Sequence, residues 1–174
     1  MTAIEIIQEF NQTRDFKRWT NFYLQNPKLI NELVDVIVRK EKYPIAEYSS
    51  WLLTHIVKAK KEILYDFEKQ FIEIIFNENN NQTVLRNCVN VLQFIPISNY
   101  KESELIDRYI NFIQNSNNKV ALHVYSMSNL LNMVNKYPEI KTEIVSIIET
   151  YYTERSPAYK FAVRSFLKNT KKIN

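Results

Sequence analysis

Two histidines and one cysteine are the residues of this 174-residue chain whose types most often carry metal or nucleophilic chemistry. His55 and His123 lie far apart, and neither belongs to an H-x-x-x-H or H-x-x-E spacing, so a zinc site within one chain is not predicted. Cys88 has no second cysteine with which to form an internal disulfide, and it falls between apolar positions of a predicted helix. We expect it to be a small buried residue.

The chain contains no glycine. Glycine is the residue that most readily takes a positive φ, which β-hairpin turns and phosphate-binding loops require. Its absence excludes a P-loop, a dinucleotide-binding turn and the G-x-S-x-G elbow of serine hydrolases. The carboxylates lie chiefly on predicted helix surfaces and form no arrangement suited to acid–base catalysis. We therefore expect no catalytic residue, no metal and no cofactor, and we do not predict an enzyme.

Composition is typical of a globular protein, with 45% apolar and 24% charged residues and a net charge of +4. The first ten residues contain two glutamates and no basic stretch, so no secretory signal is predicted. The longest uncharged run, residues 120–135, contains His, Ser and Asn and is too polar to span a bilayer. We expect a cytoplasmic protein that does not engage a membrane.

Helix signals recur along the whole chain. Thr2 and Glu5 have the spacing of a capping box, and the pairs Asn26-Pro27 and Ser156-Pro157 are typical of helix starts. In the absence of glycine, we expect asparagine to take the left-handed position where helices end. The predicted helices begin at Thr2 and then cover approximately residues 16–23, 27–40, 44–63, 65–78, 83–95, 101–115, 119–136, 138–152 and 157–169.

The first helices of the predicted hairpins resemble one another. Ala46, Leu85, Leu122 and Tyr159 occupy equivalent positions, with spacings of 39, 37 and 37 residues. A repeat near this length with two helices per unit is typical of HEAT and armadillo arrays. The alternative is an ordinary helical bundle whose hairpins have similar lengths. We predict an all-α fold, an α-α superhelix of about four HEAT-like hairpins plus a terminal helix, in a single domain of residues 1–174.

Three consecutive segments, YSSWLLTHI, LYDFEKQFIEIIF and VLRNCVNVL, resemble a group of small bacterial HEAT-like proteins. The resemblance covers about residues 27–150 and implies an armadillo-type fold with no particular activity. Some members of that group carry the automatic label adenylosuccinate lyase. Those lyases are much longer and use a serine-bearing, glycine-containing signature loop, which nothing in this chain matches.

His123 falls at a repeat position that is polar in every copy, where the equivalent residues are Glu47, Arg86 and Lys160. We therefore expect it to be an exposed surface residue and not a catalyst.

Tyr48, Trp51 and His55 follow one another at intervals of about one turn, so they form a stripe on the predicted helix 44–63. Aromatic residues dominate the energetics of many interfaces, and such a stripe is compatible with a recognition patch. The other interpretation is that the stripe packs against the neighbouring hairpin. The sequence leaves both open, and Trp51 and His55 are kept as candidate partner-binding residues.

Charge differs between the two helices of each hairpin. The first helices contain twelve Lys and Arg against two acidic residues, counted over residues 44–63, 82–95, 118–136 and 155–172. The second helices contain four basic residues against eleven acidic ones, counted over residues 65–78, 101–115 and 138–154. Second helices usually line the concave face of such arrays. The candidate partner-binding carboxylates are therefore Asp66, Glu73, Asp107, Glu143 and Glu149.

This charge pattern is compatible with helix-surface charge that has no partner, and it also allows a non-catalytic protein–protein interaction module, or scaffold, that receives a protein or a basic peptide on its acidic second-helix face, which is the function we predict. The alternative is nucleic-acid binding, by analogy with HEAT-like alkylpurine DNA glycosylases. An acidic row opposes it, since neutralisation of phosphate supplies most of the affinity for DNA. The segment from Arg155 to Lys172, with six basic residues and no acid, is the one feature in its favour.

A third hypothesis is a homodimer formed through the C-terminal hairpin. The last predicted helix lacks a full partner, and we expect Phe161, Phe166 and Leu167 to be only partly covered.

Overall fold

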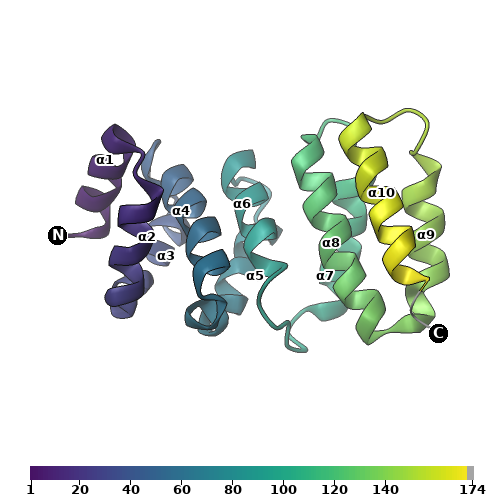
Figure 1. Ribbon diagram of the computed structural model, residues 1–174, viewed down its shortest axis with the longest axis horizontal. Helices are drawn as coiled ribbons and strands as arrows, with labels where there is room; N and C mark the ends of the chain where they lie inside the picture. Colours follow the sequence, from purple (N-terminus) through teal and green to yellow (C-terminus); the bar gives the residue numbers. More distant parts are fainter. Residues whose placement is uncertain (172–174) are drawn as a thin grey trace. The chain divides into compact units, whose positions relative to one another are not determined.

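The computed structural model describes residues 1–171, which form ten α-helices, three 3₁₀ helices and no strand (Figure 1). The α-helices are α1 (Ala3–Thr13), α2 (Phe16–Gln25), α3 (Ile30–Val38), α4 (Ile45–Ala59), α5 (Glu68–Phe76), α6 (Gln82–Leu92), α7 (Glu102–Gln114), α8 (Val120–Lys136), α9 (Lys141–Thr150) and α10 (Pro157–Thr170). The 3₁₀ helices are η1 (Pro27–Leu29), η2 (Lys61–Phe67) and η3 (Pro138–Ile140). The all-α prediction is confirmed. No helix in this range is long and apolar enough to cross a membrane.

The chain divides into two compact units, one from Met1 to Tyr100 and one that starts at Lys101. In the first unit, α4 packs against α2 and α3 on one side and against α6 on the other, and α5 contacts both α3 and α6. In the second unit, α8 packs between α7 and α10, and α9 contacts both α7 and α10. Within each unit the first helices therefore stack on first helices and the second helices on second helices, as the repeat predicts.

Each unit has an apolar core between its two rows of helices. In the first unit, Leu52, Leu53 and Ile56 of α4 are completely buried, as is Phe71 of α5. In the second unit the buried residues include Leu105 and Tyr109 of α7, Leu130 of α8 and Val163 of α10. A helix with one apolar face gains most of its stability from such packing, since an isolated helix of this length is marginal in water.

Two of the three predicted helix caps are present. The Thr2 Oγ1 accepts from the Glu5 backbone N–H at 3.3 Å, and Glu5 Oε2 accepts from the Thr2 N–H at 2.8 Å, which completes the capping box. Ser156 Oγ accepts from the Tyr159 N–H at the start of α10. The prediction for Asn26 is wrong. Its Nδ2 donates back to the Phe22 carbonyl at 2.9 Å, and Pro27 opens η1 before α3 begins at Ile30.

The left-handed positions are taken by basic residues and not by asparagine as predicted. Arg14, Lys40 and Lys101 have φ of 52°, 56° and 50°. A non-glycine residue in this region costs roughly 1 kcal/mol or more, so the surrounding contacts must offset that cost. Arg14 shows how. Its Nε donates to the Asn11 carbonyl at 2.9 Å, and its guanidinium lies 4.2 Å from the centre of the Tyr48 ring.

Helix boundaries differ from the prediction in two places. The helix expected over 65–78 begins as the 3₁₀ helix η2, and α5 starts only at Glu68. The helix expected over 83–95 ends at Leu92, four residues before Pro96, because a proline restricts the residue before it to extended backbone and cannot continue a helix.

The contact between α4 and α6 depends on small and polar side chains. Ser49 and Cys88 occupy equivalent repeat positions and are both buried, which lets the helices approach closely. Beside them, Asn87 Nδ2 donates to Ser50 Oγ at 3.0 Å, and Ser50 Oγ donates to the Glu47 carbonyl at 2.7 Å. This buried chain of hydrogen bonds joins the first helices of two successive hairpins.

Replacing Asn87 by alanine removes the only side-chain donor that links Ser50 to α6 in the described part of the chain. We expect Asn87→Ala to lower the free energy of unfolding by about 1–2 kcal/mol, measured by urea denaturation. The matched control is Asn21→Ala in α2, which is exposed and gains the same helix propensity. Equal stability of the two variants would show that the hydrogen bond adds nothing to the stacking.

Candidate interaction surfaces

The predicted carboxylates of the second unit lie at the surface of α7 and α9. Asp107 projects from α7 on the side opposite the buried Leu105 and Tyr109, and Glu143 is exposed on α9. Among the described residues, no side chain forms a hydrogen bond or ion pair with either carboxylate. Both are therefore available to a partner. We call this pair, with the exposed neighbours Glu104 and Glu139, the acidic second-helix surface.

Glu149 is also exposed, but it lies away from Glu143 on the same helix. The two residues are six positions apart, which places their side chains about 120° from one another around the axis of α9. A single narrow ligand could not contact both.

Glu102, at the start of α7, is not part of the exposed set. Its two carboxylate oxygens accept from Lys136 Nζ at 2.6 Å and from the Tyr137 hydroxyl at 2.7 Å, which ties α7 to the end of α8. Burial by itself would raise the pKa of Glu102, but these hydrogen bonds and the charge of Lys136 outweigh it and lower the pKa.

In the first unit the predicted carboxylates have different surroundings. Asp66 is exposed in η2. Glu73 is exposed on α5, accepts from the Tyr100 hydroxyl, and lines a shallow apolar cavity of about 280 Å³ together with Lys40 and Lys69. Two lysines therefore share this cavity with Glu73, and the acidic row of the first unit stays a prediction.

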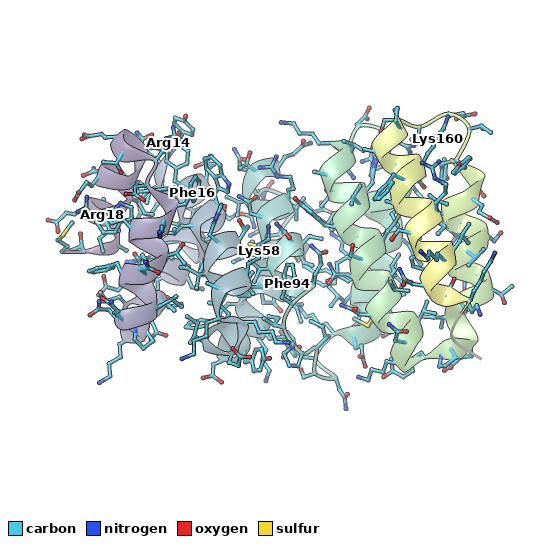
Figure 2. The ribbon with its side chains drawn as sticks, in the orientation of Figure 1. Arg14, Phe16, Arg18, Lys58, Phe94 and Lys160 are labelled. Atoms are coloured by element: carbon cyan, nitrogen blue, oxygen red, sulfur yellow. The ribbon has the colours of Figure 1, made fainter. Side chains whose placement is uncertain are left out.

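The Tyr48, Trp51 and His55 stripe packs against the helices that precede it. Phe16 at the start of α2 lies 4.5 Å from the Trp51 ring and stacks on His55 at 4.0 Å between ring centres. Arg14 and Phe16 lie close together at the junction of α1 and α2 in Figure 2. The stripe is half-buried, and its rings contact both Phe10 of α1 and Phe16 of α2, which helps to hold these helices on α4.

His55 is a packed residue in this cluster. Burial lowers its pKa, and the nearby positive charge of Lys58 lowers it further. A neutral ring stacked on Phe16 has a structural explanation, so the structure offers no reason to assign it a catalytic role.

The prediction that His123 is exposed is wrong, since its residue is only 2% exposed. Its Nε2 donates to the Asn115 carbonyl at 3.1 Å, and its ring meets Tyr159 edge-on at 5.8 Å. The equivalent Glu47 is buried as well, whereas Arg86 and Lys160 are half-buried.

Next to His123 lies a polar cavity of about 540 Å³ that the sequence did not indicate. It is formed where the end of α7, the start of α8 and the segment between α9 and α10 meet, at the upper ends of α8 and α10 in Figure 1. The residues that line it are Gln114, Ser116, Asn118, Val120, His123, Tyr151, Glu154, Arg155, Ser156 and Tyr159.

The C-terminal hairpin exposes less apolar surface than predicted. Phe166 is 2% exposed and Leu167 is half-buried, whereas Phe161 is 69% exposed. Phe161 borders a groove of about 200 Å³ between α8 and α10. A homodimer through this hairpin stays a prediction.

Cys88 is buried, as predicted, and burial raises the pKa of its thiol to about 12. It is therefore protonated at neutral pH. Within residues 1–171, no cluster of three or more His, Cys, Asp or Glu could hold a metal ion.

A family model described as a HEAT repeat domain matches residues 6–172, which is nearly the whole chain. Comparison with curated proteins and with solved structures finds no significant match.

The buried His123 makes stability depend on pH. Burial lowers its pKa, the hydrogen bond to the Asn115 carbonyl raises it, and the charge of Arg155 lowers it, with a net decrease below the ordinary value. As the pH falls through about 6.5, the histidine of the unfolded chain takes up a proton before His123 of the folded protein does. The contribution of the neutral, buried His123 to the free energy of unfolding is therefore complete above that pH and is lost below it.

We expect His123→Gln, which keeps a donor for the Asn115 carbonyl, to reduce the loss of unfolding free energy between pH 7.5 and pH 5.5. Urea denaturation at the two pH values measures this loss. His55→Gln provides the comparison for the second histidine, whose lowered pKa also makes the folded protein less stable as the pH falls. A pH dependence unchanged from that of the parent protein would contradict a neutral, buried His123.

Proposed function

Since the chain belongs to the HEAT repeat family, we propose that it is a non-catalytic interaction module that receives a basic segment of a partner protein. The proposed contact is the acidic second-helix surface of α7 and α9. Stacked helical hairpins offer a rigid, extended surface, and scaffolds of this kind commonly bind other proteins.

The observation that carries the proposal is the pair of exposed carboxylates, Asp107 and Glu143, that no residue in the described part of the chain engages. An exposed charge that takes no part in folding costs the fold little and remains available for recognition. The packing of α7 against α9 places the two carboxylates on neighbouring helices of one row. A basic segment would thus meet acid from two rigid elements.

The opposite row of the same unit has the opposite charge. Lys160, Arg164, Lys168 and Lys171 follow one side of α10, opposite its buried residues. Separation of charge between two rows gives the unit a directional field, which speeds the encounter with a charged partner and selects its orientation more than it adds affinity. Salt should therefore weaken the contact, because exposed charges are screened over about 8 Å at physiological ionic strength.

The test uses a fluorescent ten-residue oligolysine peptide and the full chain, with binding measured by fluorescence anisotropy at low and physiological salt. We expect the double reversal Asp107→Lys/Glu143→Lys to weaken binding by about tenfold or more, since it replaces attraction by repulsion on both helices. The control is Glu62→Lys/Glu78→Lys, which makes the same change in net charge at exposed positions of the first unit.

Equal weakening by both double variants would show that only net charge matters, and the proposed surface would be wrong. The same conclusion follows if the parent protein does not bind the peptide at low salt.

Nucleic-acid binding is the second candidate, favoured by the basic side of α10. That helix contains Lys160, Arg164 and Lys168 and no acidic residue. The predicted basic segment runs on to Lys172, which lies outside the described residues.

A titration of duplex DNA at 50 and 200 mM salt separates the two candidates. Under our proposal we expect no binding that exceeds the weak non-specific level at the higher salt. If DNA binding is tight at both salt concentrations and falls markedly in Arg164→Ala/Lys168→Ala, the nucleic-acid function replaces the one proposed.

A further inference from the structure

We infer that the cavity beside His123 binds inorganic phosphate in its protonated, monohydrogen form. This site lies in the second unit at the ends of the hairpins, and it is independent of the acidic second-helix surface. Its recognition groups are Arg155, as a fixed donor, and His123, as an acceptor.

Arg155 is held in place by contacts that leave part of its guanidinium unused. Its Nη2 donates to the carbonyls of Ile113 and Gln114, both at 3.3 Å, at the end of α7. Its Cζ lies 5.3 Å from the centre of the Tyr151 ring and 5.8 Å from that of Tyr159. Among the described residues, Nη1 and Nε have no acceptor. A preoriented guanidinium with unused donors is suited to bind two oxygens of an oxyanion.

His123 provides the complementary group. Because Nε2 donates to the Asn115 carbonyl, the neutral ring presents Nδ1 as an acceptor, and Nδ1 has no hydrogen-bond partner in the part of the chain that the structure describes. The lowered pKa of His123 agrees with a neutral ring. The ring is almost completely buried, and it lines the cavity. A ligand that satisfies this nitrogen must therefore bring an O–H or N–H of its own.

The two groups together select one class of oxyanion. Phosphate near neutral pH has both ionised oxygens, which Arg155 can bind, and a hydroxyl, which can donate a hydrogen bond to His123 Nδ1. Sulfate has no proton at this pH, and a simple carboxylate such as acetate has none either. An anion without a proton cannot donate to Nδ1 and would place its negative charge against the nitrogen lone pair, so we expect it to bind more weakly.

The rest of the cavity is compatible with phosphate. The helix α8 begins at Val120 without a side-chain cap, and Ser116, Asn118 and Val120 all line the cavity. Glu154 is also present, but it is exposed to solvent. Its negative charge opposes anions, so we expect an affinity in the millimolar range for inorganic phosphate.

The two histidines of the chain allow a direct test by NMR. Their ring signals are recorded while inorganic phosphate is added to the full chain at pH 7.5 and constant ionic strength. We expect the His123 signals to shift in a saturable manner while the His55 signals stay unchanged, because His55 lies among the aromatic residues of the first unit. Sulfate and acetate should produce at most a fifth of the shift at equal concentration.

The matched variants are Arg155→Lys, which keeps the charge but loses the planar donor pair, and Arg164→Lys, an exposed arginine on α10 outside the cavity. We expect at least fivefold weaker phosphate binding by the first variant and no change in the second. A non-saturable shift, an equal response to sulfate, or equal weakening by both variants would overturn the inference. A phosphate monoester loses its second proton at about pH 6, so we expect phenyl phosphate to produce no larger shift than sulfate at pH 7.5.

Discussion

Stacking of first helices on first helices is the contact on which the structure of each unit depends. No hairpin of this chain buries its apolar faces alone, since α4 needs α2, α3 and α6 around it and α8 needs both α7 and α10. Close stacking requires small side chains where the helices cross, and Ser49, Cys88 and Ser126 are buried at such positions. Larger residues there would separate the helices and expose the leucine and isoleucine core on either side.

This packing also determines which residues remain for recognition. Apolar and polar residues on the inner faces of the helices are buried in the contacts between helices. The aromatic rings at the start of the chain are also packed in such contacts, since Phe16 of α2 packs against the Trp51 and His55 rings. What is left on the outside is mostly charge. In the second unit that charge is sorted by row, with acid on α7 and α9 and base on α10, whereas in the first unit Lys40 and Lys69 line one cavity together with Glu73.

The ends of the hairpins behave differently from their sides. Helix termini leave backbone groups without partners inside the helix, so segments at the ends gather polar side chains. In the second unit the carbonyls at the end of α7 accept from Arg155 and His123, which come from two later elements of the chain. The result is a cavity whose walls are held in place by packing. It contains hydrogen-bond donors of Arg155 and an acceptor of His123 that have no partner among the described residues.

The sequence by itself determined the approximate positions of the helices and the repeat, but not their pairing: α4 was expected to pair with α5 and α8 with α9, whereas α4 packs on α3 and α6, and α8 packs on α7 and α10. Prolines, caps and helical periodicity act within a few residues, so the capping box at Thr2 and the start of α10 at Ser156-Pro157 are where they were predicted. The sequence also identified the exposed carboxylates of α7 and α9, because a charged residue opposite an apolar face points to water whatever its neighbours are.

Only the tertiary structure decided the burial of His123, the cavity beside it, the lysines around Glu73 and the use of Arg14, Lys40 and Lys101 in left-handed backbone. Each of these depends on groups far apart along the chain: Arg155 reaches the end of α7 across 41 residues, and Tyr48 lies 34 residues from the Arg14 it supports. Periodicity reports which side of a helix is apolar. It does not report which side chain from a distant helix will pack over a polar residue. Packing of that kind is the reason why His123 is buried and not at the surface.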